Sequence, residues 1–295
     1  MEIDRSELKR QARERVALTD PKFWVVALAY LAMTTGVSWL ISLIPLPGPV
    51  ADTVGIFLQF LLILYTTVVQ FGLCLWALWT YRQLDPGINS LMQGFSVAGR
   101  VILMELGIYV RVLGWYLLVA LGLLIPTVVL MMFADYILGM ALLLLFGAVL
   151  IAVIIVISLR YALAPYMLAD RPDDGPTAPI YRSAMLMRGW KMELFKLEVS
   201  FLGWELINLI LSGAVILLCL SHAGLLTQAA LTDPVWRERC LDVLYSPLTV
   251  ILSTLVTVPV DLWLLPYRAT ARAGFYDARI LASTQDIQWP QMPPL

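Results

Sequence analysis

Residues 136–158 read YILGMALLLLFGAVLIAVIIVIS and contain no charged side chain. About 20 apolar residues in a helix cross a hydrocarbon core of about 30 Å, so this run predicts a transmembrane helix. Six such runs, each bounded by charge or proline, predict spans at about 23–44, 54–80, 112–133, 136–158, 207–226 and 244–265. We therefore expect an all-α membrane protein, a bundle of six transmembrane helices with amphipathic interfacial helices on its cytoplasmic side.

Composition supports the same class. The 295-residue chain is 60% hydrophobic and 14% charged, whereas soluble domains are about 25% charged. We expect an amphipathic interfacial helix over residues 1–20, a six-helix transmembrane domain over 21–282 and a flexible tail over 283–295.

The charged N-terminal segment predicts a helix. Leu8, Ala12 and Val16 follow one another at intervals of four residues and so share one helix face, with basic side chains around them. This pattern favours a helix at the membrane surface with its cationic flank toward lipid headgroups; an ordinary solvated helix is the alternative. The apolar run that follows is too long for a cleaved signal peptide.

The third span needs a choice of register. Residues 101–133 would measure about 50 Å as one helix, which exceeds the thickness of a bilayer. We therefore place residues 101–109 at the interface and the span itself at 112–133. Glu105 and Arg111 then lie at the membrane surface rather than at the midplane.

Positive charge predicts the orientation. By this assignment, all Lys and Arg residues fall on one side of the membrane except Arg237 and Arg239, which belong to a charged external loop expected at 233–242. Lys and Arg accumulate in cytoplasmic loops. We therefore expect a protein of the bacterial cytoplasmic membrane with both termini on the cytoplasmic side. The same residues would meet anionic headgroups at the cytoplasmic face, which leaves no reason to expect a nucleic-acid partner.

Several charged residues fall near the apolar zone, where charge is costly and points to function. One hypothesis is a polar vestibule open to the cytoplasm. The alternative is that interfacial charges pair with one another or reach the headgroups, and thereby hold the helices in register. The candidates are Glu105, Arg111, Arg160, Glu198, Glu205, Asp261 and Arg268.

Patterns typical of enzymes are missing from the sequence. The three cysteines are widely spaced, and His222, the single histidine, has no accompanying acid or nucleophile motif. The run Asp170–Asp174 resembles a calcium loop only superficially, because Pro172 occupies a ligand position. We therefore expect no catalytic residues, no cofactor and no metal site, and a non-enzymatic role is favoured.

The segment 160–170, RYALAPYMLAD, begins a set of motifs that continues to residue 276, and residues 7–14, ELKRQARE, add to it. On these motifs the chain resembles the bacterial integral membrane proteins grouped as domain-of-unknown-function family nine-seven-five. The resemblance implies a polytopic membrane protein and supplies no activity. The motif residues that we expect at the cytoplasmic interface are Tyr161, Pro165, Tyr166, Asp170, Ser183, Gly189, Ser200, Gly203, Trp204, Trp263, Pro266, Tyr267, Phe275 and Tyr276.

Small residues in this set suit close helix packing, and its aromatic residues suit an interfacial belt. The same residue types would serve a binding surface, so both interpretations stay open. For function, the first hypothesis is a transport or permease-like role through the vestibule. The alternative is a membrane scaffold or accessory subunit that organises lipid, a homo-oligomer or a membrane partner protein; an enzyme acting on lipid-linked substrates is least favoured.

Overall fold

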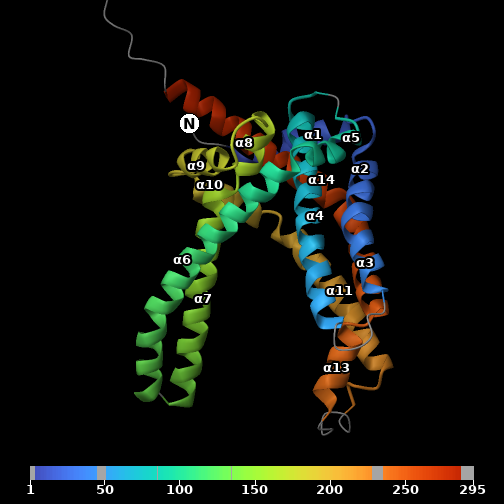
Figure 1. Ribbon diagram of the computed structural model, residues 1–295, viewed down its shortest axis with the longest axis vertical. Helices are drawn as coiled ribbons and strands as arrows, with labels where there is room; N and C mark the ends of the chain where they lie inside the picture. The colour runs from blue at the N-terminus through green and yellow to red at the C-terminus, as the bar shows by residue number, and fades with distance from the viewer. Residues whose placement is uncertain (1–3, 45–50, 85, 134, 228–234, 287–295) are drawn as a thin grey trace, which may run out of the picture. The chain divides into compact units, whose positions relative to one another are not determined.

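A computed structural model describes residues 4–44, 51–84, 86–133, 135–227 and 235–286 (Figure 1). Within these ranges every regular element is a helix. Six helical stretches are long and apolar enough to cross a membrane, which confirms the all-α class and the number of spanning-length helices that the sequence predicted. They are Phe23–Ser42, Thr53–Tyr81, Asn89–Phe133, Tyr136–Asp170, Leu202–His222 and Pro247–Ser283.

The chain divides into two compact units. Unit 1 contains Val97–Lys196 and the chain from Phe275 onward, and unit 2 contains Asp4–Ser96 and Leu197–Gly274. Both α10 (Lys191–Val199) and α14 (Pro247–Asp286) contribute residues to each unit.

Unit 2 begins with α1 (Arg5–Ala17), which is capped by Asp4 through its contacts with the first backbone N–H groups. Leu8, Ala12 and Val16 are buried, as their spacing predicts. The helix packs on α4, so its apolar face is covered by protein.

The next helices of unit 2 form its first two spans. α2 (Phe23–Leu31), the π-helical turn η1 (Ala32–Gly36) and α3 (Val37–Ser42) follow one another without a break. α4 (Ala51–Tyr81) is the second span, and the short α5 (Asn89–Gln93) and η2 (Gly94–Val97) fold back against it.

Glycine allows the close approach of α4 and α5. A Cβ at Gly72 would lie 2.3 Å from the carbonyl oxygen of Leu91, and one at Gly94 would lie 2.6 Å from the carbonyl oxygen of Val68. Backbone therefore meets backbone at this contact, which is the packing that small residues permit between membrane helices.

The last helices of unit 2 differ in their bounds from the expected spans. α11 (Leu202–His222) ends earlier than residue 226 because Gly224, with φ of +69°, takes the left-handed conformation that terminates a helix. α13 (Trp236–Leu244) is a helix where the sequence predicted a charged loop, and its Trp236 indole donates to the Leu225 carbonyl at 2.8 Å.

α14 continues far beyond the expected end of the sixth span at residue 265. It runs unbroken to Asp286 although Pro259 and Pro266 both lie inside it. The tail expected from residue 283 therefore begins as helix, and the part of that prediction from residue 287 onward lies outside the described residues.

Unit 1 is built on a helical hairpin. α6 (Ala98–Phe133) is a single helix that carries both the segment expected at the interface and the third span, and α7 (Tyr136–Tyr161) packs against it. The short helices α8 (Ala164–Asp170) and α9 (Thr177–Leu186) then pack on each other, and α9 also contacts both hairpin helices.

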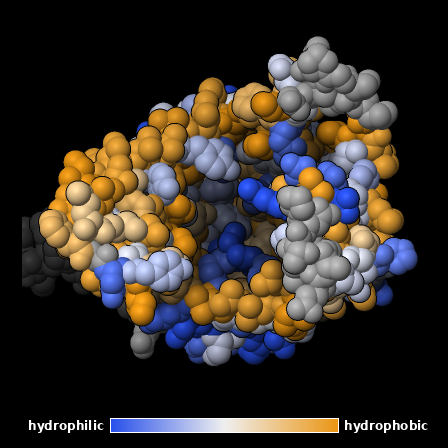
Figure 2. Space-filling model, turned by 90° about the horizontal axis from the view of Figure 1, so that it is seen from below, coloured by the Kyte–Doolittle hydropathy of each residue, from blue (hydrophilic) through white to orange (hydrophobic). Residues whose placement is uncertain are grey.

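The hairpin helices are apolar yet almost entirely exposed. In the most apolar segment of the stretch that ends at Phe133, 0% of the residues are buried. In the most apolar segment of the stretch that begins at Tyr136, 6% are buried. Figure 2 shows hydrophobic residues (orange) over much of the outward surface in that view. Surfaces of this kind are expected where the surrounding solvent is hydrocarbon.

Candidate functional site

Four charged side chains of unit 2 form an ion-paired group, which we call the Arg268 cluster. Arg268 donates from Nε to Glu198 Oε2 at 2.8 Å and from Nη1 to Glu205 Oε1 at 2.6 Å. Arg272, one turn later on α14, donates to the other oxygen of Glu198. The cluster thus joins α10, α11 and α14 and unites three residues of the predicted vestibule.

Electrostatics keep the most buried acid of this cluster ionised. Burial raises the pKa of Glu198, but hydrogen bonds and positive charge from Arg272 and Arg268 outweigh it and hold the pKa below its ordinary value of 4.5. The Glu198 side chain is 16% exposed, and the Arg268 side chain is 31% exposed. Since both acids have an arginine partner, the geometry favours charges that hold helices together.

Aromatic motif residues continue from the cluster toward α1. Phe201 meets Tyr267 edge-on with ring centroids 5.2 Å apart, and Trp263 lies between Tyr267 and Trp204 at 4.8 and 4.9 Å. Lys9 of α1 lies 4.9 Å from the centre of the Phe201 ring. These cation–π and ring contacts dock the N-terminal helix onto the motif.

Two further contacts complete this docking. Lys9 Nζ donates to Ser200 Oγ at 3.1 Å, and Arg13 lies 5.7 Å from the Tyr267 ring. The motif residues Gly203 and Pro266 belong to the same unit, on α11 and α14.

Asp261 forms a separate polar pair inside the spans of unit 2. Asn208 of α11 donates from Nδ2 to Asp261 Oδ1 of α14 at 2.8 Å. The amide oxygen of Asn208 is buried and accepts no hydrogen bond among the described residues. Asp261 was predicted from the sequence, whereas Asn208 was not, although an amide in an apolar run is itself a usable signal.

The three other vestibule candidates belong to unit 1. Glu105 and Arg111 lie on α6, and Arg111 donates to the carbonyl of Gly107 in its own helix at 2.7 Å. Arg160, at the end of α7, lies 5.7 Å from the Tyr161 ring. The predicted vestibule residues therefore belong to two units, and among the described contacts only Glu198, Glu205 and Arg268 of unit 2 take part in an ion-paired group.

The remaining motif residues form a second group, in unit 1. The Ser183 hydroxyl accepts from the Leu163 N–H at 3.3 Å and donates to the Arg160 carbonyl at 3.1 Å, which ties α9 to the end of α7. Tyr276 stacks on Tyr166 at 5.9 Å and donates its hydroxyl proton to Asp170 at 2.6 Å.

Three more motif residues support the same packing. Phe275 is fully buried, Pro165 lies in the first turn of α8, and Gly189 has a φ of +78° between α9 and α10. The family motif thus separates into two structural groups, and α14 supplies residues to both.

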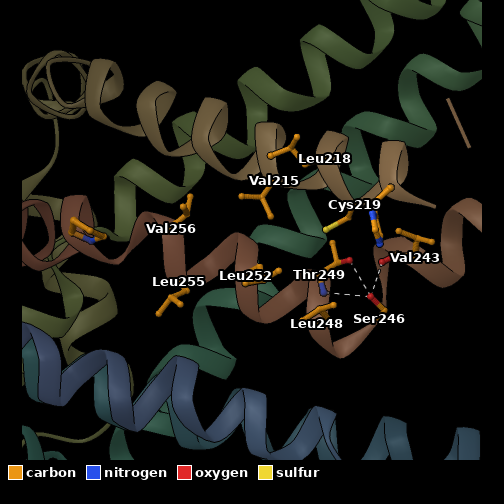
Figure 3. Close-up of a pocket in the computed structure, with 12 residues that line it drawn as sticks. Val215, Leu218, Cys219, Val243, Ser246, Leu248, Thr249, Leu252, Leu255 and Val256 are labelled. Atoms are coloured by element: carbon orange, nitrogen blue, oxygen red, sulfur yellow. Dashed lines mark hydrogen bonds between the residues drawn. The ribbon is translucent and has the colours of Figure 1, made fainter. Parts of the chain in front are cut away.

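A pocket of about 800 Å³ lies in unit 2 between α11, α13 and α14 (Figure 3). Val215 and Cys219 of α11 face Leu252 and Thr249 of α14 across it. Its further lining includes Leu218, Leu248, Leu255, Val256, His222 and Ser246. The sequence analysis did not anticipate this pocket, because α13 was expected to be a loop.

The polar groups of the pocket gather at one end. His222 is the last residue of α11, and Ser246 immediately precedes α14. The Ser246 hydroxyl donates to the Val243 carbonyl at 2.9 Å and contacts the Thr249 hydroxyl at 2.9 Å. The pocket therefore has a polar mouth and an apolar body.

The described residues contain no group of three His, Cys, Asp or Glu side chains placed to hold a metal ion. Arg272 and Asn208 are the polar residues that the sequence analysis missed at these sites. Arg272 follows Arg268 by four residues and so shares its helix face, which is a signal that spacing alone could have supplied.

Comparison with known proteins agrees with the resemblance read from the motifs. Residues 1–282 match the model of a family described as protein of unknown function (DUF975). A search of curated proteins and a search of solved structures each found no match to the chain. The match covers nearly the whole sequence, and the chain therefore belongs to the DUF975 family.

Proposed function

We propose that this protein binds a membrane lipid in the pocket between α11, α13 and α14. The observation that carries the proposal is a pocket of about 800 Å³ with an apolar body and a polar mouth. Binding sites for small molecules typically occupy about 300–1,000 Å³ and combine apolar walls with a few polar groups. This role is a form of the scaffold or accessory function that organises lipid.

The dimensions of the pocket support an acyl chain as its occupant. Its lining on α14 extends from Leu248 to Pro259, a rise of about 17 Å along a helix. One leaflet contributes about half of a hydrocarbon core of about 30 Å. An acyl chain lying along Leu252 and Val256 would place its headgroup near His222 and Ser246.

The pocket would also open toward the hydrocarbon of the membrane, from which a lipid would come. α11 is a spanning helix with no buried residue in its described length. An acyl chain can therefore enter from the side, out of the membrane hydrocarbon. Its entry then removes no apolar surface from water. Each buried methylene group contributes about 0.8 kcal/mol when it comes from water, but far less when it comes from lipid. The polar mouth must therefore provide the selectivity.

The first test measures the lipid that remains with the protein purified in mild detergent. Leu252→Trp fills the body of the pocket and should lower the retained lipid per protein at least tenfold, as measured by extraction and mass spectrometry. Leu209→Trp, on the exposed surface of α11 outside the pocket, is the matched control and should retain the wild-type amount. Equal lipid in wild type and Leu252→Trp would contradict the proposal.

Cys219 offers an independent readout, because its thiol lines the pocket. With Cys74 and Cys240 replaced by Ala, alkylation of Cys219 should slow when the protein is returned from detergent to vesicles of bacterial lipid. A cysteine placed at Leu209 reports the general effect of the bilayer. Equal slowing at the two positions would show that no molecule occupies the pocket specifically.

A second candidate function is transport, and the Asn208–Asp261 pair favours it. An ionisable side chain on a spanning helix is costly and commonly marks a path for ions or substrate. In proteoliposomes, wild-type protein should collapse an imposed ion gradient faster than Asp261→Ala protein. Gradient decay equal to that of empty liposomes, for protons, sodium and potassium, would remove this candidate.

We also propose the location and orientation that the charges support. In unit 2 the Arg268 cluster and α1 lie at one end, while Arg237 and Arg239 lie on α13, near the pocket. Basic residues accumulate on the cytoplasmic side. In a bacterial cytoplasmic membrane, both termini would then lie on the cytoplasmic side and the pocket would lie in the outer leaflet. A reporter that labels residue 234 from the cytoplasm, or residue 174 from outside, would contradict this orientation.

The same orientation suggests partners for α1 and for the hairpin of α6 and α7. α1 would lie at the inner surface with Arg5 and Arg10 toward anionic headgroups. The exposed hairpin of α6 and α7 would contact lipid, a second copy of the chain or a membrane partner protein. Crosslinking in native membranes, from cysteines placed at Leu121 and Leu144, tests for a protein at that surface.

A further inference from the structure

Asn208 and Asp261 form the one polar pair in the described structure that joins two spanning helices through a carboxylate and an amide. The amide nitrogen of Asn208 donates to one oxygen of Asp261, which leaves the oxygen of the same amide group to be accounted for. That oxygen is buried and accepts no hydrogen bond among the described residues. An acceptor left unpaired in this way costs about 1–3 kcal/mol.

A second acid lies in the same neighbourhood. Glu205 of α11 is close enough to Asp261 for their charges to interact, and the Thr257 hydroxyl, one turn before Asp261 on α14, is placed to hydrogen-bond with its carboxyl group. Glu205 is paired with Arg268, whereas Asp261 has no basic partner among the ion pairs of the described residues. An ionised Asp261 would therefore face a like charge in an apolar surrounding.

We propose that the Asn208–Asp261 pair is a proton-binding site, with Asp261 held as a neutral carboxylic acid. The proton comes from water and adds to the carboxylate oxygen that does not accept from Asn208. Its O–H then donates to the Asn208 amide oxygen. Acid and amide are joined by two hydrogen bonds, and the acceptor that the structure leaves unpaired receives a donor.

A protonated Asp261 accounts both for the unpaired amide oxygen of Asn208 and for the acidic neighbour Glu205. A neutral acid removes the repulsion from Glu205 and avoids the cost of a charge between spanning helices. Loss of the proton would break one of the two hydrogen bonds and restore a charge between α11 and α14. The inference rests on the pair itself and depends on neither lipid binding nor transport.

Infrared spectroscopy of the full-length protein in vesicles tests the inference directly. A protonated carboxylic acid has a C=O stretching band that a carboxylate lacks. Wild-type protein at neutral pH should show such a band, and Asp261→Asn should lose it. Glu198→Gln is the control, since Glu198 is ionised in the Arg268 cluster, and it should keep the band.

Asn208→Leu tests the partner. The band should persist but move to higher frequency, because the O–H would lose its acceptor. Asp261→Asn also guards against misfolding, since an asparagine can form the same two hydrogen bonds with Asn208. Its thermal midpoint should therefore equal or exceed that of wild type, and the midpoint should no longer depend on this proton.

Two results would overturn the inference. One is a carboxylic acid band of equal intensity in wild type and Asp261→Asn, or no such band in either. The other is a lower thermal midpoint for Asp261→Asn than for wild type, which would show that the negative charge of Asp261 is the stabilising form.

Discussion

The span α4 in unit 2 and the hairpin of α6 and α7 in unit 1 are all apolar enough to cross a membrane but differ in their surroundings. More than half of the most apolar window of α4 is buried within the protein, whereas almost none of the hairpin is. α4 carries Trp76 and Leu78, which are essentially inaccessible, while Leu121 and Leu144 of the hairpin are largely exposed.

Apolar residues in spanning helices therefore have two different roles. An apolar residue that faces another helix contributes packing, because neighbouring atoms fill the space around it. An apolar residue that faces hydrocarbon has lipid on one side, and changing its size leaves the protein contacts intact. Two apolar spans should therefore respond very differently to the same substitution.

Gly72→Ala should have the largest effect. The new Cβ would lie 2.3 Å from the Leu91 carbonyl oxygen, and backbone must move to relieve the clash. Overpacking of this kind costs about 3 kcal/mol at the upper end of its usual range. We expect a large fall in the thermal unfolding midpoint in detergent, measured by tryptophan fluorescence. An unchanged midpoint would show that α4 and α5 do not approach as closely as described.

Arg268→Met should be the next most destabilising change. It leaves Glu205 without its arginine, and Glu198 keeps only Arg272. Removing one partner of a buried ion pair costs about 3–5 kcal/mol. Partial exposure of the cluster reduces the expected loss to about 2 kcal/mol.

Arg10→Met is the matched control for this change. Arg10 also bridges two acids, Glu7 and Glu14, but it does so on the exposed face of α1. Its loss should lower the midpoint far less than Arg268→Met does. Equal effects would indicate that the Arg268 cluster is as open to water as the surface of α1.

Acid should weaken the same cluster. The pKa of Glu198 is lower in the folded protein than its ordinary value of 4.5, so the folded state binds its proton less readily. The resulting stabilisation is complete above about pH 4.5 and disappears as the pH falls through the folded pKa. Between pH 6 and pH 3 wild type should lose more stability than Glu198→Gln. Parallel pH profiles would show that Glu198 is not stabilised by its arginines.

Local patterns in the sequence predicted much of this fold. Apolar runs located the spanning helices, and the spacing of Leu8, Ala12 and Val16 identified the buried face of α1. These signals lie within a few residues of one another, so no knowledge of the tertiary structure was needed.

Contacts between distant segments account for what was missed. Glu198 and Arg268 are 70 residues apart in the chain, and nothing in their spacing predicts that they pair. α13 forms where charged residues suggested a loop, because Cys240 is buried and Trp236 bonds to Leu225. α14 continues through two prolines, which membrane helices tolerate because neighbouring helices, side chains and local adjustments satisfy the freed backbone groups. Tertiary context decides each of these features.

Gly122→Ala should have the smallest effect, and it is the counterpart of Gly72→Ala. Both glycines lie inside spanning helices, but nothing lies within 4 Å of a Cβ built at Gly122. Alanine is favoured over glycine in a helix by about 1 kcal/mol in water, so the midpoint should stay the same or rise slightly. A large fall would mean that another surface packs closely on α6 in the purified protein. A second copy of the chain would then be the first candidate for that surface, and the fall should disappear when the protein is dispersed to monomers.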